Sequence, residues 1–295
     1  MLKRLITGSV YVAILVGFFF LRLVHTSFFG ILIWAFSILG TFEMLRAFSH
    51  VESSEKGENT LPKTNLSIAQ KSTVFAFSII LTPAYYAVSH FFPQKNYIAI
   101  LAVFFLLVIV LLSLLVFDKN STLEGLGASF ICAVYPNALL STLLLMNDFS
   151  SGATLALLLT FTVSPIADSF AYIVGSIFKG KKLCPTISPK KTISGAVGGV
   201  VFGTAGCVLI YFLFTLASNY TYQGVLNPWI MFAIVGFIGS IVTEFGDLVE
   251  SVIKRKIGIK DMGKILPGHG GVLDRIDGTL FASAFIYIIF VLFIV

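Results

Sequence analysis

Nine long runs of apolar residues alternate with polar segments along the 295-residue chain. A helix needs about 20 mostly apolar residues to cross the hydrocarbon core of a bilayer. By that measure, the pattern predicts nine membrane-spanning helices at residues 5–23, 27–48, 73–92, 97–117, 128–146, 152–177, 195–217, 229–251 and 273–294. The expected fold is therefore an all-α polytopic integral membrane protein with about nine transmembrane helices.

Composition supports a membrane location and excludes an ordinary soluble domain. Hydrophobic residues make up 57% of the chain and charged residues only 12%, whereas soluble domains contain about 25% charged residues. The chain has neither a Walker A pattern nor a Rossmann GxGxxG pattern. Neither of those two nucleotide-binding folds is therefore expected.

Lysine and arginine are concentrated in alternate loops, and cytoplasmic loops carry the excess of these residues in membrane proteins. If the N-terminus is inside, eighteen of the twenty fall on the cytoplasmic side, and only Arg22 and Lys95 fall outside. We therefore expect a multi-pass protein of the cell (inner or plasma) membrane. Its N-terminus should be cytoplasmic and its C-terminus should lie on the opposite side.

The two halves of the chain differ in chemical character. The spans within residues 1–150 contain little that implies chemistry, whereas residues 151–295 contain intramembrane carboxylates and two basic loops, 178–194 and 254–271. Because two spans separate these loops, both should emerge on the cytoplasmic face. We expect one membrane domain, residues 1–295, with scaffold spans in its first half and the catalytic groups in its second.

One pair of opposite charges stands out in the first half. Glu43 and Arg46 lie three residues apart in the second predicted span. Side chains at that spacing are neighbours on a helix face. We therefore expect an ion pair near the cytoplasmic end of this helix.

Carboxylates recur near the cytoplasmic ends of two later spans. Asp168 lies in the sixth span with no cation within one turn, and three acids, Glu244, Asp247 and Glu250, lie within seven residues at the end of the eighth. An ionisable group inside a membrane segment is a candidate functional group because its charge is costly to bury there. Clustered carboxylates suit a hard, oxygen-seeking cation such as Mg2+.

A basic, glycine-rich segment, SVIKRKIGIKDMGKILPGHGGVLDRID, joins the last two spans. Its glycines permit tight turns and a close approach of backbone amides to an anion. Its cations can neutralise phosphate oxygens, and Asp274 and Asp277 stand at the start of the last span. Basic groups, open backbone and acidic ligands together indicate a site that handles a polyphosphate with Mg2+.

This segment resembles the signature of the phosphatidate cytidylyltransferases (CDP-diacylglycerol synthases). The matching positions are Ser251, Lys254, Arg255, Lys260, Asp261, Gly263, Pro267, Gly268, His269, Gly270, Gly271, Asp274, Arg275 and Asp277. The resemblance continues through Gly246, Asp247 and Glu250, ISPKKT at 187–192, and Asp168, Ala171 and Tyr172, so it covers about the C-terminal half. The family usually continues ISPKKT with Trp-Glu-Gly, whereas here Ile193 and Ser194 precede Gly195.

The resemblance implies transfer of the cytidylyl group of CTP to phosphatidate, which gives CDP-diacylglycerol and pyrophosphate for phospholipid biosynthesis. The residues then expected to be catalytic are Asp247, Asp274, Lys254, Arg255 and Arg275. Those expected to bind substrate are Lys190, Lys191, Ser188, Lys260, Gly268, His269, Gly270, Gly271 and Ser251. Mg2+ is the expected cofactor, held by Asp247 and Asp274, with Asp277, Glu250 and Asp168 as weaker candidates.

The expected partners are CTP, phosphatidate in the bilayer and membrane lipid, with no nucleic acid. A second cation, a homodimer, the acyl-chain preference and the way in which the base is read are left open. Two other functions also stay open. A CTP-dependent lipid-alcohol kinase would transfer the γ-phosphate, and a transporter would use intramembrane acids for ion coupling. A transporter is expected to show two related halves with broken helices, and the sequence shows neither repeat nor symmetry.

Overall fold

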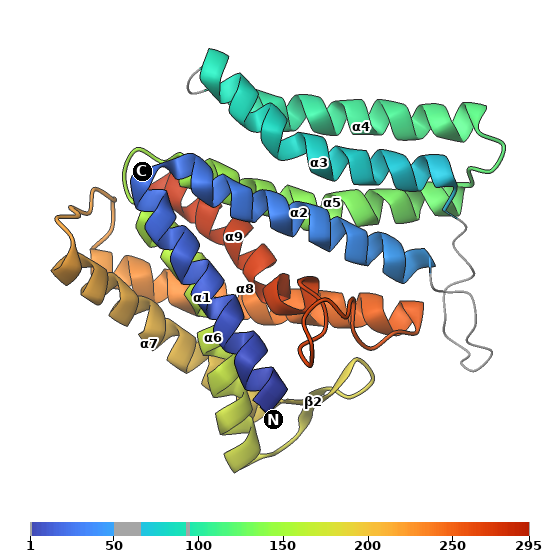
Figure 1. Ribbon diagram of the computed structural model, residues 1–295. Coiled ribbons are helices and arrows are strands. Elements are labelled where there is room, and N and C mark those ends of the chain that lie inside the picture. Colours follow the sequence, from blue (N-terminus) through green and yellow to red (C-terminus); the bar gives the residue numbers. More distant parts are fainter. Residues whose placement is uncertain (1, 50–65, 93–94, 295) are drawn as a thin grey trace. The chain divides into compact units, whose positions relative to one another are not determined.

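The computed structural model describes residues 2–49, 66–92 and 95–294, with side chains from Ile6 onward. These residues form nine long helices and one short β-hairpin (Figure 1). The elements are α1 (Leu2–Val24), α2 (Thr26–Ser49), α3 (Ile68–Phe91), α4 (Tyr97–Phe117), α5 (Leu123–Asn147), α6 (Ala153–Phe178), β1 (Lys182–Cys184), β2 (Ser188–Thr192), α7 (Ile193–Ala217), α8 (Pro228–Ile257) and α9 (Leu273–Phe293).

All nine predicted spans are confirmed as helices within the described ranges, and each is long and apolar enough to cross a membrane. Two details of the structure differ from the prediction. The fold is not purely helical, because the segment expected as the loop 178–194 contains the antiparallel hairpin β1–β2. The segment expected as the loop 254–271 begins inside α8, which continues to Ile257.

Four of the eighteen cations on which the predicted membrane orientation depends have side chains outside the described part of the chain, namely Lys3, Arg4, Lys56 and Lys63.

Helix α8 runs past the apolar stretch for a local reason. Lys254, Arg255 and Lys256 form its last turn, where positive charge is favoured by the negative end of the helix dipole. The helix ends at Gly258, which has a positive φ of 82°. The amide of Gly258 donates to the carbonyl of Arg255, and that of Ile259 donates to the carbonyl of Lys254. This pair of bonds is the glycine-terminated Schellman cap.

The chain divides into two compact units, each described here by itself. Unit 1 comprises residues 1–144 and 254–275, and unit 2 comprises residues 145–253 and 276–295. This is a division by packing, so the expected contrast between a scaffold half and a catalytic half stays a prediction.

Polar contacts between helices fix the packing of unit 1. Trp34 on α2 donates its indole N–H to the carbonyl of Ile79 on α3, at 2.9 Å. Asn137 on α5 bonds to the hydroxyls of Ser37 and Thr41 on α2. Side-chain hydrogen bonds of this kind join helices where apolar burial alone gives little preference for one partner. They hold α2 at the centre of unit 1.

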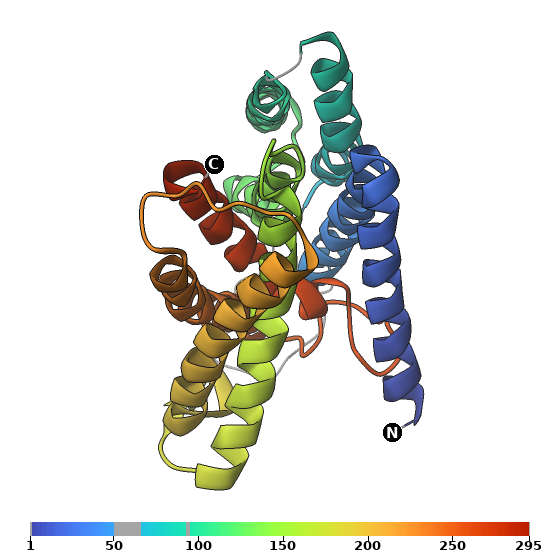
Figure 2. The same cartoon turned by 90° about the vertical axis from the view of Figure 1, so that its left-hand side faces the viewer.

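Unit 2 is built on the pair α6 and α7, which lie side by side and antiparallel (Figure 2). The hairpin β1–β2 connects them at one end, with Lys182 opposite Thr192 and Cys184 opposite Ser188. The rings of Phe170 and Phe202 stack across the two helices with centroids 4.2 Å apart. The hairpin therefore extends from a rigid two-helix base.

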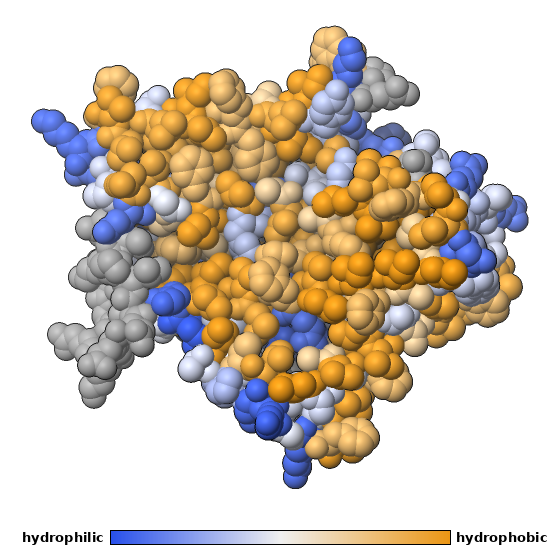
Figure 3. All heavy atoms as spheres, turned by 180° about the vertical axis from the view of Figure 1, so that it is seen from behind, coloured by the Kyte–Doolittle hydropathy of each residue, from blue (hydrophilic) through white to orange (hydrophobic). Residues whose placement is uncertain are grey.

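Apolar side chains also cover much of the outside. Figure 3 shows one such face, on which hydrophobic residues predominate. On α1, Leu23 and Val24 are 70% and 77% exposed, and on α4 Phe117 is 83% exposed. Exposed apolar surface of this extent is typical of helices that face lipid. The protein is therefore a multi-pass membrane protein.

Candidate active site

The segment between α8 and α9, residues 258–272, is called the signature loop here. Gly268 and Gly270 have φ values of 79° and 86°, a region that side chains with a Cβ rarely adopt. Between them the chain reverses, so that the amide of Leu266 donates to the carbonyl of Gly270 at 3.0 Å. The glycines of this loop therefore shape a tight backbone turn, as expected.

Asp274, in the first turn of α9, ties the signature loop together. Its Oδ1 lies 2.7 Å from Nζ of Lys254. Its Oδ2 accepts from the amides of Met262 and Gly271, at 2.9 and 2.7 Å. The carboxylate is only 4% exposed, and protein groups engage both of its oxygens. Its geometry is that of a clamp on the loop, and its assignment to a metal stays a prediction.

Glu43 is a second clamp, and the sequence interpretation missed it. This α2 residue is 1% exposed, and it accepts from the amides of Val272 and Leu273, each at 2.9 Å. A carboxylate at a helix N-terminus satisfies free amides and the positive end of the helix dipole. The expected ion pair with Arg46 is absent among the described residues, because both carboxylate oxygens are turned toward the start of α9. The signal was an acid in an otherwise apolar span.

Helix α1 also contacts the signature loop. The Thr7 hydroxyl donates to the carbonyl of Pro267 at 3.1 Å. A Cβ added to Gly8 would lie 3.6 Å from the imidazole of His269. The N-terminal spans thus support the loop as well as packing against one another.

Unit 2 contains the other group of predicted site residues. The carboxylates of Asp168, Glu244, Asp247, Glu250 and Asp277, called the carboxylate cluster here, come from α6, α8 and α9. Asp277 lies within hydrogen-bonding reach of Glu250 and Asp247. A Cβ on Gly246 would lie 2.9 Å from the carbonyl of Asp277. Glycine at 246 therefore permits the close approach of α8 and α9 that brings these acids together.

Lys191 on β2 faces the carboxylate cluster. Its Nζ lies 2.6 Å from Asp247 and 3.7 Å from Glu244. Burial alone lowers the pKa of Lys191, but the negative charges of Asp247, Glu244 and Asp168 outweigh burial and raise that pKa above its ordinary value of 10.5. Lys191 therefore stays a cation at neutral pH.

A cavity of about 730 Å³ opens beside Lys191 in unit 2. Its lining includes Asp168, Glu244 and four lysines, Lys179, Lys182, Lys190 and Lys191. Sites for small ligands have volumes of roughly 300–1,000 Å³. The cavity thus combines room for a nucleotide-sized ligand with cations that suit phosphate.

The predicted site residues fall into two sets. Unit 1 contains Lys254, Arg255, Lys260, Gly268, His269, Gly270, Gly271, Asp274 and Arg275. Unit 2 contains Asp168, Ser188, Lys190, Lys191, Asp247, Glu250, Ser251 and Asp277. Sequence reasoning gave no site role to Glu43, and it named Glu244 only as one of three clustered acids without an individual role. Glu244 was recognisable only from its place one turn before Asp247 on the same helix stripe.

The departure at Ile193 and Ser194 has a structural counterpart. The Ser194 hydroxyl donates to the carbonyl of Lys179, which follows the end of α6. The Thr192 hydroxyl accepts from the amide of Gly195 at 3.1 Å and caps α7. The base of the hairpin is thus closed by short hydroxyl side chains at the position where the family usually has a glutamate.

The donor chemistry of the carboxylate cluster fits Mg2+. Its oxygens are hard ligands, and Glu244 and Asp277 are 6% and 8% exposed. Neither oxygen of Glu244 has a hydrogen-bond donor among the described residues. In the present side-chain positions, no three acidic, histidine or cysteine side chains of the described chain converge on one point. Mg2+ at this cluster therefore stays a prediction.

The chain is similar to several phosphatidate cytidylyltransferases. The phosphatidate cytidylyltransferase of Bacillus subtilis is 30% identical over 99% of this chain and 98% of its own length. That of Thermotoga maritima is 38% identical over 59% of this chain and 62% of its own length. That of Brucella abortus is 42% identical over 50% of this chain and 51% of its own length. The sequence model of the Cytidylyltransferase family matches residues 2–293, and the chain therefore belongs to the cytidylyltransferase family.

Proposed function

We propose that this protein is a phosphatidate cytidylyltransferase, which converts CTP and phosphatidate into CDP-diacylglycerol and pyrophosphate. The observation that carries the proposal is the match of the family along nearly the whole chain, residues 2–293. A relative of that activity also aligns over 99% of the chain. Nine apolar helices suit an enzyme whose acceptor is a membrane lipid.

The reaction is an attack by a phosphate oxygen of phosphatidate on the α-phosphorus of CTP. A new P–O–P bond forms, and the bond between the α-phosphorus and the bridging oxygen breaks as pyrophosphate leaves. A phosphate monoester is already largely ionised at neutral pH, since its second pKa is about 6. The enzyme therefore needs no strong general base, and positioning and charge neutralisation supply most of the catalysis.

The signature loop supplies one part of this neutralisation. Arg255, Lys260 and Arg275 are exposed cations beside or within it, and its backbone turns at Gly268 and Gly270. Arginine and lysine side chains bind phosphate oxygens through charge-assisted hydrogen bonds. Lys254 is paired with Asp274, so it contributes mainly by holding the loop in shape. His269 helps to shape the turn that presents these groups.

The carboxylate cluster is the proposed metal site, with Asp247, Glu250 and Asp277 as its principal ligands and Asp168 at its edge. When bound, Mg2+ neutralises charge on the triphosphate and on the departing pyrophosphate. Lys190 and Lys191, on the hairpin, bind phosphate oxygens from the cavity beside the cluster. Ser188 lies on the same strand as these lysines, and Ser251 follows Glu250 on α8; both are proposed to bind substrate through their hydroxyl groups. Lys191 also holds Asp247 in place at 2.6 Å.

The membrane orientation follows from the distribution of charge. CTP is a cytoplasmic, water-soluble substrate, and the cationic residues of loops 178–194 and 254–271 suit its triphosphate. We therefore propose that both segments face the cytoplasm, with the N-terminus on the same side and the C-terminus opposite.

The proposal is tested by the choice of acceptor. The purified protein in mixed micelles, supplied with CTP and Mg2+, should convert phosphatidate into a cytidine-containing lipid and release pyrophosphate. Diacylglycerol should give no lipid product. The rival reading, a CTP-dependent lipid-alcohol kinase, predicts the reverse preference, with phosphorylation of the alcohol and release of CDP. If only diacylglycerol is converted, the proposed function is wrong and the protein is a lipid-alcohol kinase.

A further inference from the structure

A second basic hollow lies in unit 1, and Lys260 is the one residue of its lining that the sequence assigned to substrate binding. It has a volume of about 330 Å³ and is formed by the last turn of α2 and residues 259–264. Its charged lining consists of Arg46, Lys260, Lys264 and Asp261. All four are exposed at the surface. Three cations and one carboxylate give the hollow a net charge of +2.

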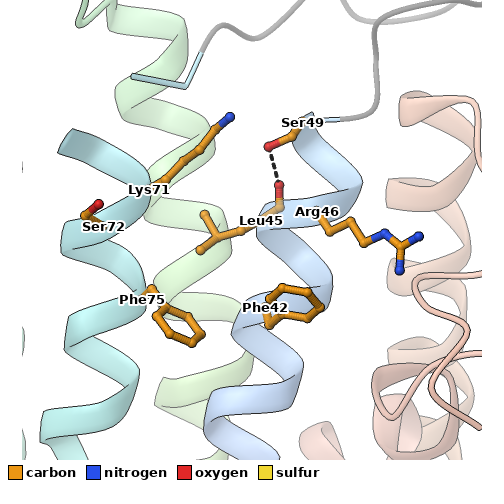
Figure 4. Close-up of a pocket in the computed structure, with 7 residues that line it drawn as sticks. All are labelled: Phe42, Leu45, Arg46, Ser49, Lys71, Ser72 and Phe75. Carbon is orange, nitrogen blue, oxygen red and sulfur yellow. Dashed lines mark hydrogen bonds between the residues drawn. The ribbon is translucent and has the colours of Figure 1, made fainter. Parts of the chain in front are cut away.

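Arg46 points its charge into this hollow. Figure 4 shows the guanidinium turned away from Lys71 and toward the C-terminal part of the chain. Lys71 belongs to a different hollow, of about 400 Å³, between α2 and α3, where Phe42, Leu45 and Phe75 make the walls apolar. Arg46 lines both hollows, and its guanidinium lies on the side of α2 away from Lys71 (Figure 4).

Glu43, one turn before Arg46 on α2, makes the buried contacts that place Arg46 beside the signature loop. Glu43 holds the start of α9 through Val272 and Leu273. A Cβ on Gly263 would come within 2.2 Å of a Glu43 oxygen, so the loop lies directly against α2. Side chains three apart on a helix share one face. The clamp at Glu43 therefore presents Arg46 to Lys260 and Lys264.

We infer that Arg46, Lys260 and Lys264 bind a phosphate group of one of the two substrates, an inference that rests on the proposed function. The planar guanidinium presents paired N–H donors that match phosphate oxygens. Lysine side chains add charge without restricting the geometry. The carboxylate of Asp261 offsets one of the three positive charges of the hollow. The net charge stays positive, so the hollow suits an anion that is itself partly neutralised. Helix α2, predicted as scaffold, thereby contributes directly to substrate binding.

The test measures KM for CTP and for phosphatidate separately, together with kcat, in Arg46→Gln, Lys264→Gln and Lys71→Gln. The loss of one charge-assisted phosphate contact corresponds to an increase of about 10-fold in KM. We expect this increase for one substrate in Arg46→Gln and Lys264→Gln, with little change in kcat. Lys71→Gln removes a neighbouring charge of the same sign from the other hollow and should leave both KM values unchanged. Arg46→Lys should give an intermediate KM, because it keeps the positive charge but loses the paired N–H donors of the guanidinium.

The substrate that responds identifies the bound phosphate. An increase in KM for phosphatidate places the lipid phosphate at Arg46, and an increase in KM for CTP places the triphosphate there. Both KM values unchanged in folded Arg46→Gln and Lys264→Gln would overturn the inference, as would an equal increase in Lys71→Gln. Melting curves establish whether each variant is folded. If Arg46→Gln is not folded, Arg46→Lys is used in its place. Absence of CDP-diacylglycerol with the unaltered protein would instead contradict the proposed function.

Discussion

Nζ of Lys254, in the last turn of α8, lies 2.7 Å from Oδ1 of Asp274, in the first turn of α9. This ion pair joins the two ends of the signature loop, and both side chains are nearly buried, at 11% and 4% exposure. The second oxygen of Asp274 holds two amides of the same loop. These contacts fix the shape of the loop.

Asp274→Asn should destabilise the protein as well as reduce its activity. Removal of one partner from a buried ion pair costs roughly 3–5 kcal/mol, because the other charge stays buried without compensation. Thermal unfolding in detergent should show a clearly lower melting temperature. Glu124→Gln, at an exposed position in the first turn of α5, is the matched control and should melt like the unaltered protein.

Asp247→Asn should behave differently from Asp274→Asn, because Asp247 is 26% exposed and is a proposed ligand. Its melting temperature should fall less than that of Asp274→Asn, because Glu244 and Asp168 still face Lys191, while the Mg2+ concentration for half-maximal activity rises about 10-fold or more. An Asp274→Asn variant with normal stability and the same shift in Mg2+ requirement would restore Asp274 as a ligand and contradict its role as a clamp.

The contact between Glu43 and the signature loop predicts a strong effect at Gly271. A Cβ there would lie 2.5 Å from a Glu43 oxygen, so Gly271→Ala should destabilise the protein by roughly 1–3 kcal/mol, the range for overpacking of a filled interior. Gly127 lies within α5 with nothing within 4 Å of an added Cβ. Gly127→Ala should therefore stabilise by roughly 0.5–1 kcal/mol. Equal effects in the two variants would show that Glu43 does not constrain the loop.

The nine helices could be predicted from the sequence because an apolar run of bilayer length has few alternatives to a membrane-spanning helix. The boundaries were less accurate where polar residues continue a helix. The basic composition of the last turn of α8 is typical of a loop. The helix dipole and the cap at Gly258 nevertheless favour a helix there. The hairpin β1–β2 was missed because SPKKT has little strand propensity and is held by its partner strand.

The sequence indicated candidate site residues in two ways. The cost of intramembrane charge pointed to Asp168, Asp247 and Glu250, and the motif named Asp274 and the glycines of the signature loop. Glu43 was assigned to Arg46 because helix spacing reports neighbours on one helix and gives no information about partners more than two hundred residues away. The pairing of Lys191 with Asp247 depends in the same way on tertiary packing, which places the hairpin against α8.

Lys191 should not titrate in the neutral range. Its pKa is raised in the folded state, so the stability that it contributes is present below its ordinary value of 10.5 and is lost as the pH rises through the raised value. Stability curves of the unaltered protein and Lys191→Gln should therefore run parallel between about pH 6 and 9. A loss of stability with an apparent pKa of about 7–9 that disappears in Lys191→Arg would contradict this prediction. It would show that burial lowers the pKa of Lys191 more than the neighbouring carboxylates raise it.

Cys184 reports the orientation of the hairpin in the membrane. It is a free, partly accessible thiol on β1, whereas Cys132 and Cys207 are buried. A variant with Cys184 as its only cysteine should react with a membrane-impermeant maleimide only after the cells are opened, because the charge distribution places the hairpin in the cytoplasm. Labelling of intact spheroplasts would reverse the proposed topology.

The position of the attacked phosphorus tests the central claim most directly. CTP labelled at the α-phosphate or at the γ-phosphate is incubated with the protein, Mg2+ and an equal mixture of phosphatidate and diacylglycerol. If the protein is a phosphatidate cytidylyltransferase, α-label enters the lipid and γ-label is recovered as pyrophosphate. Lipid that carries γ-label, with α-label recovered as CDP, would contradict the assignment and identify a kinase.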